Sequence, residues 1–367
     1  METVGLKVSI KRLRRWKRIY FRINEIGGFH TMTINWKLRL WFQPFMWTSA
    51  YIFWYHLFCT TFMGVLLDAR WFWTILIYGG FALIWLLAAG SLYKALFTRP
   101  PLIPSIYRVP DEILELLSST DLEEYANIEK AYDSEDDASS TCETEDEGGD
   151  QMPKQKTENW ELFYRKLIEL ADKLGLKVRT KPMALGDKEV DCPLFCVSCN
   201  ILKPQRAHHC RHCNRCVVRF DHCCPALGAC IHLANHKFFM LLLVHATFKG
   251  IYCSVVMASF LIYVCIDFYS PSGTKLQQMA YPLAFAITGC GQAAVFPLIL
   301  TFFQWSFWSD IFEDHTTVET MIYDYDEEEQ NETVEKESEM WLRNVETLFG
   351  SRRSLWLLPI QTANLQI

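Results

Sequence analysis

The chain has 367 residues, of which 50% are apolar, and a formal net charge of −6 at pH 7. The apolar residues are gathered into long blocks rather than spread along the chain, which excludes an ordinary soluble protein of one or two domains. The charges are polarised as well, with a basic beginning and acidic runs in the middle and near the end.

Residues 1–43 form a basic region that carries ten Lys or Arg residues against two Glu. This excess of positive charge places the region in the cytosol. Its apolar residues, such as Leu6, Ile10 and Leu13, recur every three or four positions, which fits an amphipathic helix on the anionic cytosolic leaflet. A solvated basic tail that serves only as a topology signal explains the composition equally well.

Four apolar runs, at 45–67, 71–93, about 238–266 and 279–308, are each long enough to cross a hydrocarbon core of about 30 Å as a helix. The sequence therefore predicts an all-α polytopic membrane protein with four transmembrane helices and both termini in the cytosol. In chain order, the expected parts are the basic region at 1–43, spans at 44–93, a linker at 94–191, a cysteine-rich module at 192–236, spans at 237–308 and a tail at 309–367.

The cytosolic linker contains an acidic insert, because residues 111–150 hold sixteen acidic residues and one Lys. Such a composition does not bury enough apolar surface to fold alone, so we expect disorder, and a solvating spacer is a simpler interpretation than a docking tail. Residues 158–173 regain a helical period and predict a short cytosolic helix. The tail carries a second acidic run at 324–339.

The module at 192–236 is dense in cysteine and histidine. Because thiols stay reduced in the cytosol, cysteines there indicate metal binding or catalysis rather than disulfides. Two ligand sets share one spacing at an offset of fourteen residues: Cys196, Cys199, His209 and Cys216, then Cys210, Cys213, Cys223 and Cys230. This pattern predicts two closed structural zinc sites, and the module is expected to consist of short hairpins.

Neither ligand set needs Cys224, which is therefore a free thiol. A thiolate nucleophile requires a nearby base or positive charge. His222 can be that base and Asp221 can fix its tautomer, which is the arrangement of nucleophile, base and orienting acid found in catalytic triads. An inert spare cysteine is the alternative, and the residues alone weigh the two equally.

The module is also basic, with no acidic residue between the first ligand and Asp221. These cations favour binding of a phosphate-rich cofactor beside the candidate thiol. Contact with anionic lipid is the other interpretation. The cations are Lys203, Arg206, Arg211, Arg215 and Arg219, and we expect the first four to bind the cofactor.

At this point the sequence resembles the DHHC family of protein S-acyltransferases, the palmitoyltransferases. The resemblance is carried by the zinc-ligand spacing, the run "KPQRAHHC", the Asp221-His222-x-Cys224-Pro225 core and Asn235. It extends to the four spans, to "TTVE" after the fourth span and to "NVETLFGSRRSLWLLPI" in the tail.

The resemblance implies that Cys224 takes a long acyl chain, such as palmitoyl, from acyl-CoA and passes it through a thioester to cysteines of membrane-associated proteins. His222 would be the base and Asp221 would orient it. The family also buries the acyl chain between the spans. Four supporting residues are expected to brace the module: Thr316, Thr317, Glu319 and Asn344. The implied partners are acyl-CoA, substrate proteins and the bilayer of a Golgi, endoplasmic reticulum or plasma membrane, and no nucleic acid.

The sequence departs from the family pattern at several positions. Cys223 replaces a second histidine, and the offset of fourteen makes that position a zinc ligand, which cysteine serves equally well. Ala226 stands for the usual Trp, Ala229 for Asn and His232 for Gly. These losses motivate an alternative, a catalytically weak relative that acts as a zinc-stiffened membrane scaffold or partner subunit. A membrane ubiquitin ligase normally has other ligand spacings and no use for Asp-His beside a free cysteine.

Overall fold

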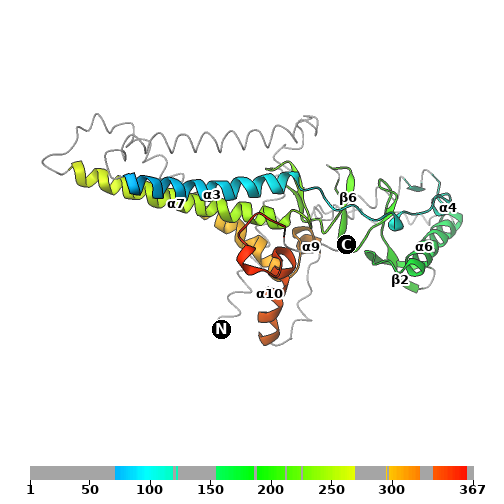
Figure 1. Cartoon of the computed structure of the whole chain (residues 1–367). Helices are drawn as coiled ribbons and strands as arrows, with labels where there is room; N and C mark the ends of the chain where they lie inside the picture. Colours follow the sequence, from blue (N-terminus) through cyan, green and yellow to red (C-terminus); the bar gives the residue numbers. More distant parts are fainter. Residues whose placement is uncertain are drawn as a thin grey trace, which may run out of the picture.

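The computed structural model of the chain describes residues 71–118, 121–122, 154–185, 188–210, 213–224, 226–268, 295, 297–322 and 334–361. The expectations for the basic region, the first span, most of the acidic insert and about half of the fourth span lie outside these residues. The described parts form an elongated molecule (Figure 1). Two long helices lie at one end, short hairpins in the middle, and a helix with a longer hairpin at the other end.

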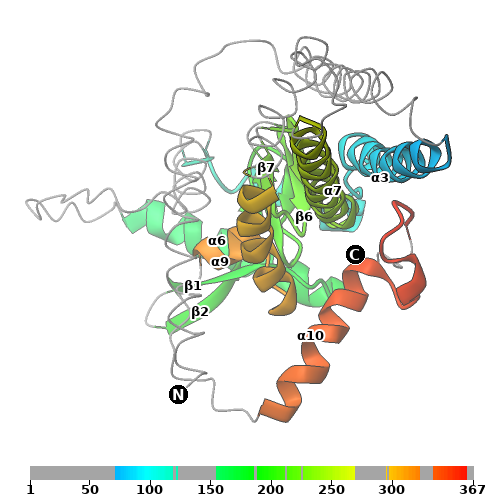
Figure 2. The ribbon, with the colours of Figure 1, turned by 90° about the vertical axis from the view of Figure 1, so that its left-hand side faces the viewer.

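The two long helices, α3 (Trp71–Phe97) and α7 (His236–Phe268), run antiparallel and side by side (Figures 1 and 2). Among the described residues, Ile75–Phe97 and His236–Val256 are the stretches long and apolar enough to cross a membrane. The predicted second and third spans are thus confirmed as apolar helices of sufficient length. The arrangement of four spans stays a prediction.

A further helical segment, residues 297–312, lies against α7, where the amide of Gln304 donates a hydrogen bond to the carbonyl of Leu243 at 3.2 Å. This segment leads through a short turn into the C-terminal part of the chain. The elements that follow are α9 (Thr317–Ile322), α10 (Val334–Phe349) and η5 (Arg353–Leu355).

A buried lysine at the start of α7 holds the C-terminal part in place. The Lys237 ammonium donates hydrogen bonds to the carbonyls of Phe349 at 3.2 Å and Ile360 at 3.0 Å. Burial of an ammonium group without hydrogen-bond partners costs free energy. The two hydrogen bonds therefore stabilise the segment after α10 in the position in which its carbonyls reach Lys237. The C-terminal segment is therefore fixed against the candidate span in α7.

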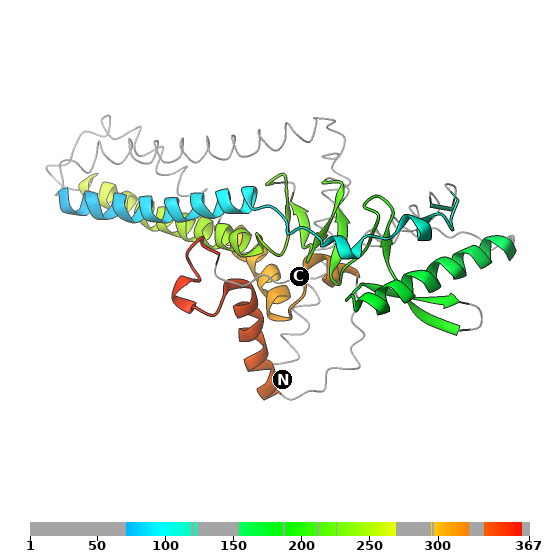
Figure 3. The same ribbon diagram turned by 45° about the vertical axis from the view of Figure 1, so that its right-hand side comes forward.

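The opposite end of the molecule is a small unit built around one long helix and one hairpin (Figure 3). Its strands pair antiparallel from Thr180↔Pro193 to Leu185↔Lys188. The helix predicted at 158–173 is confirmed, since it lies within α6. The elements of this unit are η2 (Ser105–Tyr107), α4 (Asp111–Leu114), α6 (Lys154–Leu174), β1 (Thr180–Leu185) and β2 (Lys188–Pro193).

The apolar face of α6 forms the core of this unit. Phe163 and Leu167 are fully buried, together with Phe195 and Leu202 from the neighbouring module. The rings of Phe163 and Phe195 meet edge to face, with centroids 5.9 Å apart. This contact joins the unit to the cysteine-rich module, because Phe195 directly precedes the first candidate ligand.

The expectation of an all-α protein is wrong for the part outside the two long helices, because the described residues include four two-stranded sheets. Hairpins were expected within the cysteine-rich module, but β1–β2 was not. Its strands are six residues each, and the first contains Pro182, a residue that is unusual in strands. A lone two-stranded hairpin is marginal in water, and this one is stabilised by packing on α6, a contact that no local pattern reveals.

The module itself consists of three hairpins that repeat every fourteen residues. Their closing pairs are Cys196↔Ile201, Cys210↔Arg215 and Cys224↔Ala229. The turn residues Asn200, Asn214 and Gly228 have φ of 54°, 48° and 65°, a region that favours Asn and Gly. The strands are β3 (Phe195–Cys196), β4 (Ile201–Leu202), β5 (Ala207–Cys210), β6 (Arg215–Val218), β7 (His222–Cys224) and β8 (Ala229–Ile231).

Replacing Phe163 by Ala tests the proposed core of the α6 unit. We expect a loss of about 3–5 kcal/mol in the stability of this unit, because a buried aromatic side chain is removed and a cavity is left. Leu162→Ala is the matched control, because Leu162 precedes it on α6 and is 44% exposed. Survival of the chain under trypsin across a urea series measures both variants. Equal sensitivity of the two would contradict the assigned core.

Candidate active site and metal centres

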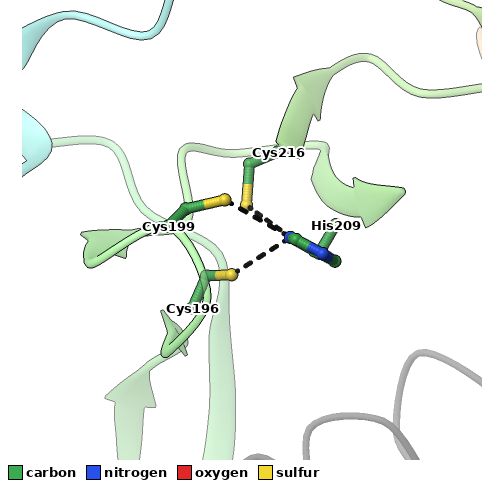
Figure 4. Close-up of side chains that lie close together, drawn as sticks. All are labelled: Cys196, Cys199, His209 and Cys216. Carbon is green, nitrogen blue, oxygen red and sulfur yellow. Dashed lines mark hydrogen bonds between the residues drawn. The ribbon is translucent and has the colours of Figure 1, made fainter. Parts of the chain in front are cut away.

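The first ligand cluster joins the first two hairpins. Figure 4 shows the sulfur atoms of Cys196, Cys199 and Cys216 directed at Nδ1 of His209. The three distances from sulfur to nitrogen are 3.3, 3.3 and 3.9 Å, respectively. A tetrahedral zinc with Zn–S bonds of about 2.3 Å separates its sulfur ligands by about 3.8 Å. All four ligand atoms lie within 4.8 Å of one another, so this donor set fits zinc.

The second cluster joins the second and third hairpins. The sulfur atoms of Cys210, Cys223 and Cys230 lie within 4.8 Å of one another, and Cys213 Sγ is 2.8 Å from Cys230 Sγ. Contacts with the Cys210 and Cys213 thiols raise the pKa of both Cys223 and Cys230, because the protonated forms are hydrogen-bonded. Metal binding to such a cluster must therefore release protons. The second hairpin contributes to both clusters and links them.

Metal content tests the second cluster. We expect Cys223→Ala to lower the zinc content of the purified chain from about two ions to about one, because three thiolates leave the tetrahedron open. Cys223→His should keep about two, since imidazole is an equivalent ligand. The matched control is Cys192→Ala, which removes a buried thiol outside both clusters. Elemental analysis of the three variants gives the answer, and unchanged zinc in Cys223→Ala would contradict the ligand assignment.

Cys224 occupies in the third hairpin the position that Cys196 and Cys210 occupy in the first two. Its side chain is buried, with 7% exposed. Three residues further on, the first two hairpins have a second cysteine, whereas the third has the buried, apolar Leu227. Among the described residues, neither group of candidate metal ligands includes Cys224. The repeat therefore presents a thiol in the conformation of a metal ligand but without a partner ligand.

His222 is held between a carboxylate and two aromatic rings. Its Nδ1 lies 2.6 Å from Asp221 Oδ2, which leaves Nε2 as the nitrogen available to Cys224. The ring stacks on Phe307 at 5.6 Å and meets Phe239 edge-on at 5.2 Å. These contacts fix both the tautomer and the orientation of the imidazole.

The pKa of His222 results from opposing effects. Burial lowers the pKa, but hydrogen bonds with Asp221 and Cys224 raise it by more than burial lowers it. The resulting pKa is about 9. The pKa of His222 is thus higher in the folded chain than the usual value of about 6.5. Protonation of the ring therefore adds to the free energy of unfolding, and this contribution is complete below a pH of about 6.5. This contribution is lost as the pH rises through about 9.

Asp221 is completely buried and connects the third hairpin to α9. Its Oδ1 accepts a hydrogen bond from the backbone N–H of Thr317 at 2.7 Å, and its Oδ2 accepts one from the Thr317 hydroxyl at 3.1 Å. Hydrogen bonds to the charged form are what a buried carboxylate requires. The orienting acid is thus held from both sides.

The "TTVE" element forms a capping box at the start of α9. The Thr316 hydroxyl accepts the backbone N–H of Glu319 at 3.2 Å, and Glu319 Oε2 accepts the backbone N–H of Thr316 at 2.8 Å. This reciprocal pair sets the first turn of the helix. Thr317, the second residue of the element, is thereby presented to Asp221.

Glu319 also makes a bidentate ion pair with Arg206, through Nε and Nη2 at 2.7 Å each. Asp314 accepts from Arg206 Nη1 at 3.0 Å and from Arg219 Nη2 at 2.6 Å. Bidentate pairs of this kind are both strong and directional. They bind the turns of the cysteine-rich module to the segment that carries "TTVE".

Asn235 connects the module to the long helices. Its amide donates to the carbonyls of Ala95, near the end of α3, and Cys230, in the third hairpin, each at 2.9 Å. Asn344, on α10, donates to the carbonyl of Phe312 at 2.7 Å. The candidate thiol is therefore fixed close to the ends of the candidate spans.

The predicted cofactor-binding cations lie in different surroundings. Arg215 is exposed, whereas Lys203 is buried and Arg206 faces carboxylates. Arg211 lies outside the described residues. His208 is buried, with its Nδ1 3.0 Å from Arg179 Nη1.

Sequence reasoning missed two groups at this site, Phe307 and Asp310. Both lie on the segment 297–312. Phe307 is inside an apolar run, where one more aromatic residue does not indicate a functional role. Asp310 comes just after that run, where a single Asp is readily interpreted as the end of a span. The third hairpin, in contrast, could have been predicted from the sequence. The turn residues Asn200 and Asn214 are fourteen positions apart, and the same offset leads from Asn214 to Gly228.

Residues 189–324 match the family model of the DHHC palmitoyltransferases. The chain is 25% identical over 203 residues to palmitoyltransferase ZDHHC15 of Homo sapiens, which covers 54% of each chain. It is 31% identical over 185 residues to palmitoyltransferase PFA3 of Debaryomyces hansenii, which covers 47% of this chain and 45% of that protein.

Residues 189–324 are therefore similar to the DHHC palmitoyltransferase family. The chain spans about half the length of these curated relatives. The matched region begins just before the cysteine-rich module and ends just after α9. It therefore contains both ligand clusters, Asp221, His222, Cys224 and the capping box.

Proposed function

We propose that the protein is an S-acyltransferase that moves a long acyl group, such as palmitoyl, from acyl-CoA to cysteines of membrane-associated proteins. The observation that carries this proposal is the 2.6 Å hydrogen bond between Asp221 and His222 beside Cys224, a thiol outside both ligand clusters. The match of residues 189–324 to the DHHC palmitoyltransferase model and the named activity of the relatives support the same reaction.

The reaction proceeds in two transfers. In the first, the Cys224 sulfur attacks the thioester carbon of acyl-CoA, a new C–S bond forms and the CoA thiolate leaves. Because its pKa is raised, His222 holds the thiol proton at Nε2 before the attack and gives it to the leaving sulfur, while Asp221 holds the proton on Nδ1. In the second, a substrate cysteine gives its thiol proton to His222 and attacks the Cys224 thioester. The acyl group passes to the substrate sulfur, and the proton returns to the released Cys224 sulfur.

The eight predicted ligands hold two structural zinc ions in this proposal. Zinc supplies no step of the reaction and instead stabilises the hairpins, since thiolate and imidazole ligands close both sites. Cys223 and Cys230 lie on the two strands of the hairpin that carries Cys224. Metal binding therefore fixes the backbone on both sides of the nucleophile.

Among the predicted acyl-CoA ligands, Arg215 is best suited to bind phosphate at the surface, because it is exposed on β6. Arg206 already makes a bidentate pair with Glu319, and Lys203 is buried. Both therefore support the site from inside, and Arg211 is the further candidate from sequence. Four spans and a cytosolic module would place the thioester at the membrane surface.

The test is transfer of a labelled long acyl chain from acyl-CoA to the purified, zinc-loaded chain. We expect label that hydroxylamine releases, its absence in Cys224→Ala, and a rate about a hundredfold lower in His222→Ala, because the base is removed. Cys192→Ala is the matched control and should keep the label, since this thiol lies in the α6 core.

Two outcomes would contradict the proposal. Label that persists in Cys224→Ala would place the thioester elsewhere. No label on wild type that contains its zinc would favour the zinc-stiffened scaffold, the alternative motivated by Ala226 and Ala229.

A further inference from the structure

A second buried carboxyl group lies next to the Asp221–His222 pair. Asp310 belongs to the segment 297–312 and is 5% exposed. Phe307, one turn earlier on the same helical segment, stacks on the His222 ring. One face of this segment therefore carries both an aromatic contact to the imidazole and a carboxyl group near its orienting acid.

Asp310 contacts α9 through two hydroxyl groups. Its Oδ2 lies 3.4 Å from the Thr317 hydroxyl, and its Oδ1 lies 3.2 Å from the Thr320 hydroxyl. The same Thr317 hydroxyl is 3.1 Å from Oδ2 of Asp221. Thr317 is thus placed between two carboxyl groups, one of which orients His222.

A threonine hydroxyl carries one hydrogen and two acceptor lone pairs. It donates to one of the two carboxyl groups at a time, and the shorter distance favours Asp221. Asp310 lies within reach of this hydroxyl as an alternative acceptor, so its carboxyl group influences the rotamer and the direction of the hydrogen, which otherwise vary near a helix start. The position of Asp310 therefore determines how firmly Thr317 holds Asp221.

We propose that Asp310 is a positioning residue for acyl transfer, which acts through the Thr317 hydroxyl on Asp221 and so on His222. This inference rests on the proposed function. Asp310 lies outside the Asp-His-x-Cys core and the "TTVE" element. The contacts of Asp310 with α9 lead to the thiol through Thr317, Asp221 and His222.

A double-mutant cycle tests this inference on the full zinc-loaded chain. The variants are Asp310→Ala, Thr317→Val and the pair, and the readout is the rate of acyl-enzyme formation as a function of acyl-CoA concentration. We expect each single variant to be roughly tenfold slower at saturation, with the half-saturating concentration unchanged. The pair should be no slower than Thr317→Val alone, because both substitutions break one chain of contacts.

Two further variants separate positioning from general structure. Asp310→Asn keeps the shape, and its amide can accept from the Thr320 hydroxyl and donate to that of Thr317, so it should recover most of the rate lost in Asp310→Ala. Glu313→Gln is the matched control, because its side chain is 36% exposed and pairs with His315 instead. If Asp310→Ala loses zinc, Asp310→Ser takes its place in the cycle.

Two results would overturn the inference. The first is a double variant in which the losses of rate of the two single variants multiply, and the second is a wild-type rate in Asp310→Ala. Failure of the proposed function is recognised separately, as absence of acyl-enzyme in wild type. In that case the same cycle is measured as alkylation of Cys224 by iodoacetamide, which needs no acyl-CoA. If the double variant is alkylated no more slowly than Thr317→Val alone, the positioning role is upheld. If the two losses multiply in the double variant, or if Asp310→Ala is alkylated at the wild-type rate, the role is refuted.

Discussion

The buried carboxylate of Asp221 is the group on which the rest of the site depends. No part of this residue reaches solvent, so its charge must be met by hydrogen bonds from the protein. His222 supplies one, and Thr317 supplies two through its backbone N–H and hydroxyl. The carboxylate therefore joins the hairpin of the candidate nucleophile to α9, which lies almost a hundred residues further along the chain.

The surrounding charges follow from the same requirement. Glu319 closes the capping box that presents Thr317, and its carboxylate also binds Arg206 of the cysteine-rich module. Separation of α9 from the module would leave buried charges unpaired on both sides, which is strongly destabilising. The ligand clusters fix the hairpins among themselves, and these ion pairs fix the hairpins against the C-terminal segment. Together they give His222 one orientation.

The sequence was informative where the signal is local. The ligand spacing predicted both clusters, and length with hydropathy predicted α3 and α7, because each pattern lies within one short stretch. Partners distant in the chain could not be predicted from residues alone. A bracing role for Thr317 came only from family resemblance, and its partner Asp221 became known from the structure. The pairing of Arg206 with Glu319 and the approach of Asp310 were missed, since they arise when separate elements pack together.

The most direct test of this account is the rate of acyl-enzyme formation in Asp221→Asn, measured together with zinc content. Asparagine keeps the shape of the side chain but offers His222 a neutral amide, which favours the wrong tautomer of the imidazole. The account predicts a rate lower by about a hundredfold or more with both zinc ions retained. A rate equal to that of wild type in a zinc-loaded chain would contradict the central role of Asp221.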